Sequence, residues 1–216
     1  MNKKTRYKHI LSWFEDNMPT VKTELKYHDP FQLLVAVILS AQCTDKRVNM
    51  ITPALFDAFP TPQAMSEAAP DDVFEYIKSI SYPNSKAKHL VGMAQMLVNE
   101  FKSIVPSDID ELQRLPGAGR KTANVIASVL YDKPAMAVDT HVFRVANRLG
   151  LTNNSKTPLN TERELVSHIP QNLISKAHHW LILHGRYVCT ARNPECDRCG
   201  LSQWCATFQD KLFKNI

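Results

Sequence analysis

A lysine directly after a glycine-rich turn is the residue whose type and position most suggest chemistry. Residues 115–122 read Leu-Pro-Gly-Ala-Gly-Arg-Lys-Thr. Gly117 and Gly119 can both take positive φ and leave uncovered N–H groups at the start of the next helix, a site for an anion such as a nucleic-acid phosphate. Lys121 opposes the dipole of that helix, so helix stability does not explain it. It is either a phosphate contact or, if burial and the dipole keep the amine neutral, a nucleophile.

Four cysteines near the end of the chain form a second group with possible chemistry. Their spacing is Cys-x6-Cys-x2-Cys-x5-Cys, at Cys189, Cys196, Cys199 and Cys205. In a chain without an export signal, such a group favours a metal site over disulfides. Only the middle pair has the short spacing of a zinc knuckle. An iron-sulfur cluster is therefore favoured, and zinc is the alternative.

Two arginines accompany these cysteines. Arg186 precedes the first cysteine, and Arg192 lies between the first and the second. A metal centre that fixes this loop would hold their positive charge in place, which suits binding to a nucleic-acid backbone. The simpler interpretation is that both side chains are only solvated.

Composition and charge narrow the class of protein. The chain has 216 residues, 44% of them hydrophobic and 22% charged, with a net charge of +5. These values are ordinary for a globular protein and mildly favour an anionic partner. The polar, basic start predicts no signal peptide, and the longest apolar run, residues 31–39, is too short to span a membrane. We expect a cytoplasmic protein with no membrane partner.

Helical patterns account for the segments that must position these groups. Apolar spacing, caps and prolines predict a first helix that carries Tyr7 to Phe14 and ends before Pro19. Further helices are expected at residues 30–41, 45–59, 85–101, 110–115, 120–130, 140–149, 159–168 and 173–187, with short ones opening at Pro62 and Pro70. Asp139 or Thr140 would cap the helix that ends at Gly150. No strand alternation appears, so the fold class is all-α.

Several stretches together resemble the endonuclease III family. They are Leu-Pro-Gly-Ala-Gly-Arg-Lys-Thr-Ala-Asn at 115–124, Ala-Val-Asp-Thr-His at 137–141 and the closing cysteines, with further similarity at 39–42, 84–87 and 179–186. Members of that family are helix-hairpin-helix bifunctional DNA glycosylases with a 4Fe-4S cluster. The resemblance implies two helical lobes flanking a DNA-binding cleft. One would be a helical barrel at 22–132 with the hairpin, and the other an iron-sulfur domain formed by 1–21 and 133–216.

The resemblance also implies an activity and the residues that carry it. The activity is base excision repair: removal of oxidised pyrimidines through a lysine Schiff base, followed by strand cleavage by β-elimination. Lys121 would be the nucleophile and Asp139 the catalytic carboxylate. The four cysteines would be the ligands of the 4Fe-4S cluster. The partner would be double-stranded DNA with damaged pyrimidines or abasic sites, bound by a monomer at the nucleoid.

The remaining matches imply contacts to DNA. Gly117 and Gly119 would hold a phosphate, and Gln42 would fill the gap left by the extruded base. Ile80 and Tyr82 lie in the loop that wedges between the strands, which here reads Ile-Ser-Tyr-Pro where the family often has isoleucine, glycine and leucine. Gln113 stands where a glutamate is often found, so both departures leave the lesion preference open.

Two other functions fit parts of the pattern. A monofunctional glycosylase of the same superfamily would lack a lysine at the position of Lys121 and would carry an extra C-terminal recognition domain. A non-catalytic DNA-binding module could use the hairpin and the cluster only to grip the backbone, but Lys121 together with Asp139 argues against it. The histidines at 141, 179 and 184 are expected to be packing residues, because a lone histidine on an apolar helix is usually a satisfied core residue.

Overall fold

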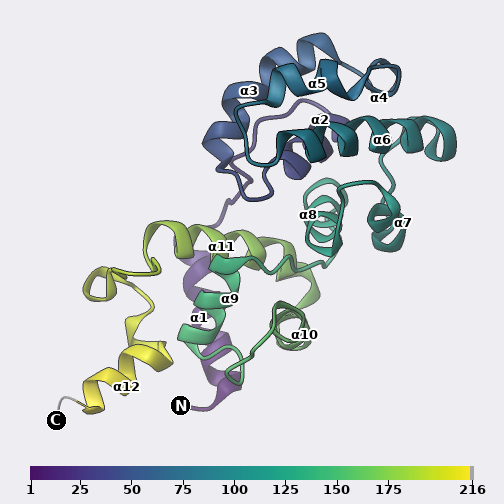
Figure 1. The fold of residues 1–216 in the computed structure, drawn as a ribbon. Helices are drawn as coiled ribbons and strands as arrows, with labels where there is room; N and C mark the ends of the chain where they lie inside the picture. Colours follow the sequence, from purple (N-terminus) through teal and green to yellow (C-terminus); the bar gives the residue numbers. More distant parts are fainter. Residues whose placement is uncertain (215–216) are drawn as a thin grey trace. The chain divides into compact units, whose positions relative to one another are not determined.

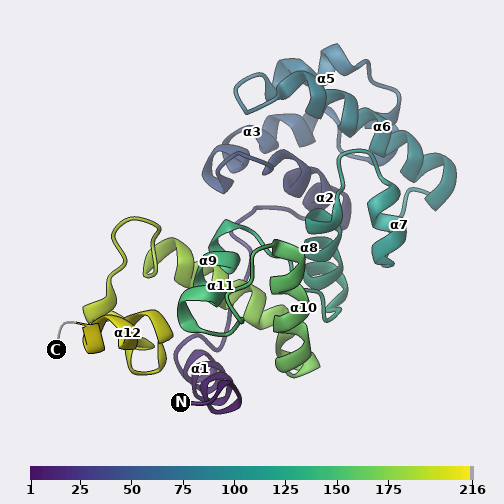
Figure 2. The same ribbon diagram turned by 60° about the horizontal axis from the view of Figure 1, so that its bottom comes forward.

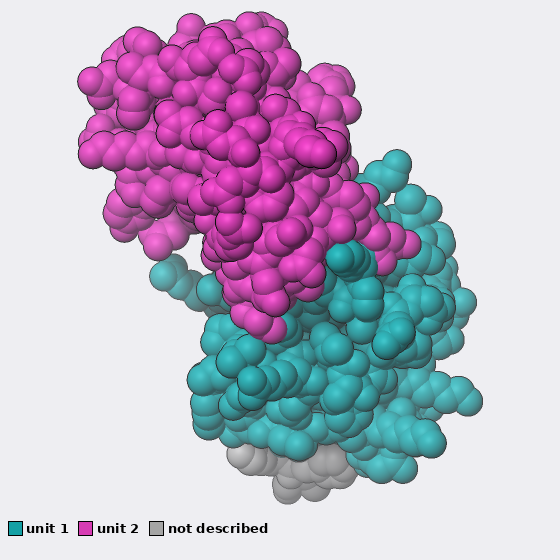
Figure 3. Space-filling model, turned by 90° about the vertical axis from the view of Figure 1, so that its right-hand side faces the viewer, with its two compact units in different colours: residues 1–22, 133–216 teal, residues 23–132 magenta. Residues whose placement is uncertain are grey.

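The computed structural model describes the backbone of residues 1–214 and the side chains of residues 1–210. Within residues 1–214 the regular elements are α-helices and short 3₁₀ turns with no strand, which confirms the all-α prediction (Figure 1). The chain divides into two compact units, coloured separately in Figure 3. Unit 1 is Met1–Lys22 with Lys133–Ile216, and unit 2 is Thr23–Asp132. No helix in the described part is long and apolar enough to cross a membrane.

Unit 2 is built around one apolar helix. Its helices are α2 (Pro30–Leu39), α3 (Asp45–Ala58), α4 (Pro62–Ser66), α5 (Pro70–Ile77), α6 (Pro83–Phe101), α7 (Ile109–Arg114) and α8 (Arg120–Tyr131). The α2 helix contacts α3, α6 and α8, and its residues from Leu33 to Leu39 are all buried. It begins as predicted, since Asp29 accepts a hydrogen bond from the Gln32 N–H at 2.9 Å.

The chain leaves α2 through a tight turn. The helix ends at Leu39, slightly before the predicted end at Ala41. Shortly afterwards Gln42 has φ 54°, a left-handed conformation in which an α-helix cannot continue. The helix expected at residues 85–101 begins slightly earlier, at Pro83, directly after Tyr82, whose φ of 56° is left-handed.

Unit 1 joins the first helix to the last third of the chain. Its helices are α1 (Lys3–Asn17), α9 (Thr140–Leu149), α10 (Pro158–His168), α11 (Ile174–Tyr187) and α12 (Ala206–Lys214). Buried residues of α1, α9, α10 and α11 form one core (Figure 2). Phe14 stacks on Trp180 with ring centroids 5.5 Å apart, and the Tyr7 hydroxyl donates to the Leu151 carbonyl at 2.8 Å. The predicted helices of this unit are confirmed within a few residues, whereas α12 was not predicted.

Candidate catalytic, DNA-binding and iron-sulfur sites

The glycine turn between α7 and α8 requires its first glycine. Gly117 has φ 80°, and a Cβ there would lie 3.0 Å from the Cβ of His89 and 3.1 Å from Cγ2 of Ile38. The expectation of positive φ is therefore right for Gly117, but it is wrong for Gly119, which is extended at φ −76° and ψ 179°. Gly119 instead forms an N-cap without a side-chain hydrogen bond, so the first N–H groups of α8 have no side-chain cap, as predicted.

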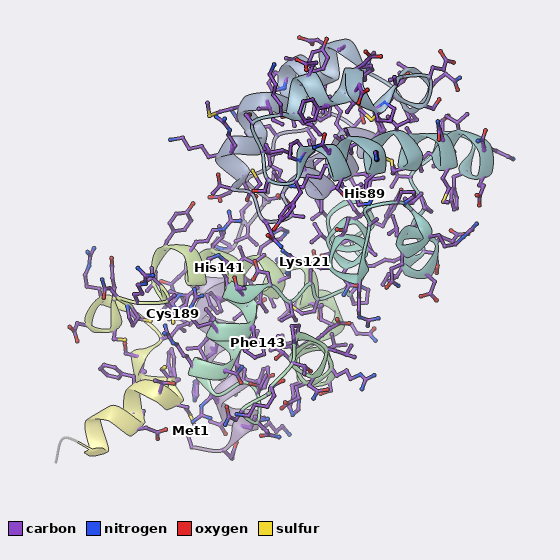
Figure 4. All side chains as sticks on the ribbon, viewed as in Figure 1. Met1, His89, Lys121, His141, Phe143 and Cys189 are labelled. Atoms are coloured by element: carbon purple, nitrogen blue, oxygen red, sulfur yellow. The ribbon has the colours of Figure 1, made fainter. Side chains whose placement is uncertain are left out.

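Lys121 is the second residue of α8 and its side chain is exposed (Figure 4). The residues of α8 that face the core, among them Ala123, Ile126 and Ala127, lie on the opposite side of the helix. This placement explains why the amine of Lys121 is exposed and not buried. An exposed amine beside uncapped N–H groups is accessible to a bound anion or to an electrophilic sugar.

Asp139 is the N-cap of α9, as expected. Its Oδ1 accepts hydrogen bonds from the N–H groups of His141 and Val142, both at 2.8 Å. Both bonds use the same oxygen, and Oδ2 has no hydrogen bond to a described residue. The cap therefore fixes the half-buried carboxylate while leaving one oxygen for a reacting group. Asp139 belongs to unit 1 and Lys121 to unit 2.

Two of the three residues expected at the strand wedge lie together on the surface of unit 2. Gln42 and Tyr82 are exposed, Tyr82 to 64%. Their loops are joined directly, because the Ser81 hydroxyl donates to the Gln42 carbonyl at 2.7 Å. Ile80 is only 6% exposed and lies in the core. The structure thus groups Gln42 with Tyr82 and leaves Ile80 out of that exposed pair.

The four closing cysteines form a set of free, half-buried thiols. Burial raises the pKa of the thiols of Cys199 and Cys205, and charge on neighbouring cysteines raises it further. Cys189 acts on both of these thiols and Cys196 acts on Cys199, so the four groups lie within electrostatic reach of one another. A thiolate donor set of this composition fits an iron-sulfur cluster.

The spacing of the thiols also bears on the zinc alternative. Among the described residues, no three histidine, cysteine, aspartate or glutamate side chains converge closely enough to hold one metal ion. In a four-iron cluster each thiolate binds a different iron, so its ligands stand farther apart than those of a single zinc ion. Four thiolates are the usual ligand set of a 4Fe-4S cluster, although such a set can also bind zinc.

Two arginines of α9 hold the cysteine loop, and sequence reasoning missed them. Arg148 donates to the carbonyls of Thr190 and Ala191 at 2.7 and 2.8 Å, and Arg144 donates to the Cys189 carbonyl at 3.1 Å. Their spacing of four residues on one helix was the available signal. Of the two arginines expected to bind DNA, Arg186 is half-buried and Arg192 is exposed.

Comparison with models of protein families defines the class of protein to which the chain belongs. The model of the HhH-GPD superfamily base excision DNA repair protein matches residues 35–171, which is more than half of the chain. The model of the iron-sulfur binding domain of endonuclease III matches residues 189–205, from the first to the last of the four cysteines. These matches describe a DNA repair protein that carries an iron-sulfur domain.

Individual relatives narrow the class further. Endonuclease III of Rickettsia felis is 47% identical over 203 residues, 94% of this chain and 95% of its own length. Endonuclease III of Escherichia coli K12 is 43% identical over 205 residues, 95% of this chain and 96% of its own length. A solved structure of a trapped endonuclease III–DNA covalent intermediate matches with a TM-score of 0.92 and 39% identity, covering 98% of this chain and 100% of that chain. The chain belongs to the endonuclease III family.

Membership in this family establishes the activity. The chain is a base-excision-repair DNA glycosylase with AP lyase activity, and DNA is its partner. Its cofactor is a 4Fe-4S cluster. The monofunctional and non-catalytic alternatives are thereby excluded.

Proposed function

We propose that the chain removes oxidised pyrimidines from double-stranded DNA, with Lys121 as the nucleophile and Asp139 as the catalytic carboxylate. It acts as a monomer in the cytoplasm, at the nucleoid. The observation that carries the proposal is the exposed amine of Lys121 in the first turn of α8, next to a helix start that has no side-chain cap. A phosphate bound there would place a deoxyribose within reach of the amine.

The reaction uses Lys121 twice. Its neutral Nζ attacks C1′ of the deoxyribose, the bond from C1′ to the base nitrogen breaks, and the base leaves with that electron pair. Loss of the amine proton and opening of the sugar give a Schiff base. Removal of a proton from C2′ then expels the 3′ phosphate by β-elimination. The strand is cleaved, and hydrolysis of the Schiff base frees Lys121.

Asp139 supports this reaction through its charge. Positive charge develops on the sugar as the base leaves, and a carboxylate fixed by two backbone hydrogen bonds stabilises it without reorganising. The free Oδ2 is the atom that would accept and relay protons. Asp139 in this assignment is both the cap of α9 and a catalytic group.

The DNA is held by groups in both units. In unit 2, Gly117 and Gly119 leave backbone N–H groups for a phosphate, and Gln42 and Tyr82 occupy the space of the extruded base. In unit 1, Arg186 and Arg192 contact the backbone. Unit 2 is accordingly the helical-barrel domain with the helix-hairpin-helix, and unit 1 is the iron-sulfur domain.

The cluster ligands are Cys189, Cys196, Cys199 and Cys205. When bound, the cluster ties the four thiolates together and so fixes the loop that carries Arg192. Arg144 and Arg148 hold the backbone of the same loop from α9. This loop would therefore present its positive charge to DNA in a defined position.

Replacing the nucleophile tests the proposal. Lys121→Gln is expected to abolish strand cleavage and borohydride capture of abasic-site DNA, while the Kd for that DNA changes less than about tenfold, because one phosphate contact is lost at most. Lys88→Gln, an exposed lysine on α6, is the matched control and should keep both activities. Capture that persists in Lys121→Gln would overturn the assignment.

A panel of duplexes tests the substrate class. We expect thymine glycol and other oxidised pyrimidines to be released faster than undamaged or mismatched thymine, because weak stacking lowers the cost of extruding a damaged base. Single-turnover rates on each duplex measure this preference. Equal rates for mismatched thymine and thymine glycol would contradict it.

A further inference from the structure

Two loop tips of unit 2 share an uncommon backbone conformation. Gln42 follows α2 and has φ 54°, and Tyr82 precedes α6 and has φ 56°. This left-handed region is unfavourable for residues that carry a Cβ, and it persists only where the surrounding structure imposes it. The residues that hold these two loops therefore determine where the exposed side chains of Gln42 and Tyr82 stand.

Hydrogen bonds join the two loops to each other and join the loop between α5 and α6 to the start of α3. The Ser81 hydroxyl donates to the Gln42 carbonyl at 2.7 Å. Arg47, in the first turn of α3, donates through Nε to the Ser79 carbonyl at 3.4 Å. The loop between α2 and α3 and the loop between α5 and α6 thus form one connected surface.

A buried lysine ties this surface to the core. Lys86 is 5% exposed, and its Nζ donates to the carbonyls of Leu39 and Ala41 at 2.8 and 2.7 Å. These carbonyls lie at the last residue of α2 and in the turn that follows it, where backbone acceptors lack helical partners and the helix dipole is negative. One ammonium group therefore fixes the chain immediately before Gln42.

The position of Lys86 on its own helix has no other explanation in the structure. It lies in the first turn of α6, where the positive end of the dipole disfavours an ammonium group. Burial lowers the pKa of Lys86, and charge on Cys43 opposes this effect. A buried lysine at an unfavourable helix end is retained when its hydrogen bonds are needed elsewhere, here at the end of α2.

We propose that Lys86 is a positioning residue for base extrusion, which holds the Gln42 loop against α6 so that Gln42 and Tyr82 enter the base stack as one preformed insert. The inference rests on the proposed function, in which these two side chains occupy the space of the extruded base. Lys86 acts through the loop and touches no DNA. A preformed insert avoids the cost of ordering two loops each time the enzyme meets a lesion.

The test removes the ammonium and keeps the stem, with Lys86→Met. The probe is a duplex with thymine glycol opposite adenine and 2-aminopurine beside the lesion, whose fluorescence rises when the stack opens. Single-turnover base release and the fluorescence rise should both slow by about tenfold to a hundredfold, as expected for a misplaced reacting geometry. Borohydride capture at a preformed abasic site should change less than about threefold, because no base remains to be extruded.

Two further variants complete the design. Lys88→Met removes the same charge from an exposed position on the same helix and should leave all three measurements unchanged. Ser81→Ala removes only the bond between the loops and should slow extrusion in the same direction by about two- to fivefold. Circular dichroism and thermal melting report whether each variant is folded.

Each result decides for or against the inference. If Lys86→Met loses base release and abasic-site capture equally, Lys86 has only a structural role, and the inference is overturned. A fluorescence rise at the wild-type rate would also overturn it. If Lys86→Met does not fold, Ser81→Ala is the deciding variant. A 2-aminopurine fluorescence rise at the wild-type rate in Ser81→Ala would then overturn the inference. Failure of the wild-type chain to capture abasic DNA would instead overturn the proposed function.

Discussion

The carboxylate of Asp139 caps α9 with Oδ1, and its Oδ2 remains available for the reaction. The cap bonds to His141 and Val142 both end on Oδ1. An asparagine can make the same cap with its side-chain oxygen, but it carries no charge. The two roles of this residue can therefore be separated by one substitution.

Asp139→Asn is expected to slow base release by about a hundredfold while the melting temperature stays nearly unchanged, because charge stabilisation is lost and the cap is kept. Single-turnover release of thymine glycol and thermal melting measure the two effects. Asp29→Asn, at the cap of α2, is the matched control and should leave the release rate unaltered. An unaltered rate in Asp139→Asn would reduce the residue to a helix cap.

The two glycines of the turn should respond differently to alanine. Gly117→Ala forces a Cβ into positive φ and against His89 and Ile38, so it should lower the free energy of unfolding by about 1–2 kcal/mol. Gly119→Ala meets no atom within 4 Å and has an extended backbone, so its stability loss should stay under about 1 kcal/mol.

Gly119→Ala should nevertheless weaken DNA binding. If the uncapped N–H groups of α8 hold a phosphate, the added methyl hinders that approach, and the Kd for abasic-site DNA should rise about tenfold. Fluorescence anisotropy at fixed salt measures the Kd, and urea unfolding measures the stability. An unchanged Kd would show that the start of α8 does not bind a phosphate of the DNA.

At the scale of elements, local signals predicted most helices. Asp29 caps α2 and Asp139 caps α9 through partners two or three residues away, so residue type and spacing were enough to find them. Positive φ at Gly117 was predicted for the same reason. The extended conformation of Gly119 was not predicted. A glycine can adopt both positive φ and extended backbone, and only the packing of the folded turn selects one of them.

The parts of the site that sequence did not reveal depend on distant contacts. Arg148 binds the Thr190 carbonyl across 42 residues, and Lys86 binds the Leu39 carbonyl across 47. The exposure of Lys121 depends on which face of α8 meets the core. The four-residue spacing of Arg144 and Arg148 shows only that they share a helix face, not which carbonyls they bind, whereas the cysteine spacing and the glycine turn are complete local signatures.

The junction of α1 and α10 should make stability depend on pH. Burial alone would raise the pKa of Glu164, but the Asn153 N–H at 2.8 Å and Lys3 at 3.0 Å hold that pKa below its usual value. A carboxylate with a lowered folded pKa stabilises the protein above its unfolded pKa of about 4.3, and this stability is lost as the pH falls through the folded pKa.

Glu164→Gln should therefore lower the free energy of unfolding at pH 7 by about 1 kcal/mol or less, since the pair is partly exposed. The difference from the wild type should shrink as the pH falls below the unfolded pKa of about 4.3 and through the lower folded pKa of Glu164, because the carboxylate then becomes protonated. Urea unfolding at several pH values measures it. A difference between Glu164→Gln and the wild type that stays constant with pH would contradict the assignment.

At the scale of the whole molecule, the cluster should matter to one unit and not to the other. Cys199→Ser is expected to reduce bound iron from about four atoms per chain and to remove the visible absorption. Limited proteolysis should then cut within residues 189–205, while unit 2 stays resistant. Cys43→Ser is the control and should keep the iron, whereas full iron content in Cys199→Ser would contradict its role as a ligand.

The pairing of α1 with the end of the chain has a consequence during synthesis. The α1 helix leaves the ribosome before its partner, because Trp180, against which Phe14 stacks, lies 166 residues further along the chain, roughly 8–33 s at about 5–20 residues per second. Unit 2, which is continuous in sequence, is completed in that interval. Until α11 emerges, the apolar face of α1 lacks the partners that it has in the folded unit, so chaperones that bind nascent chains should find this face exposed.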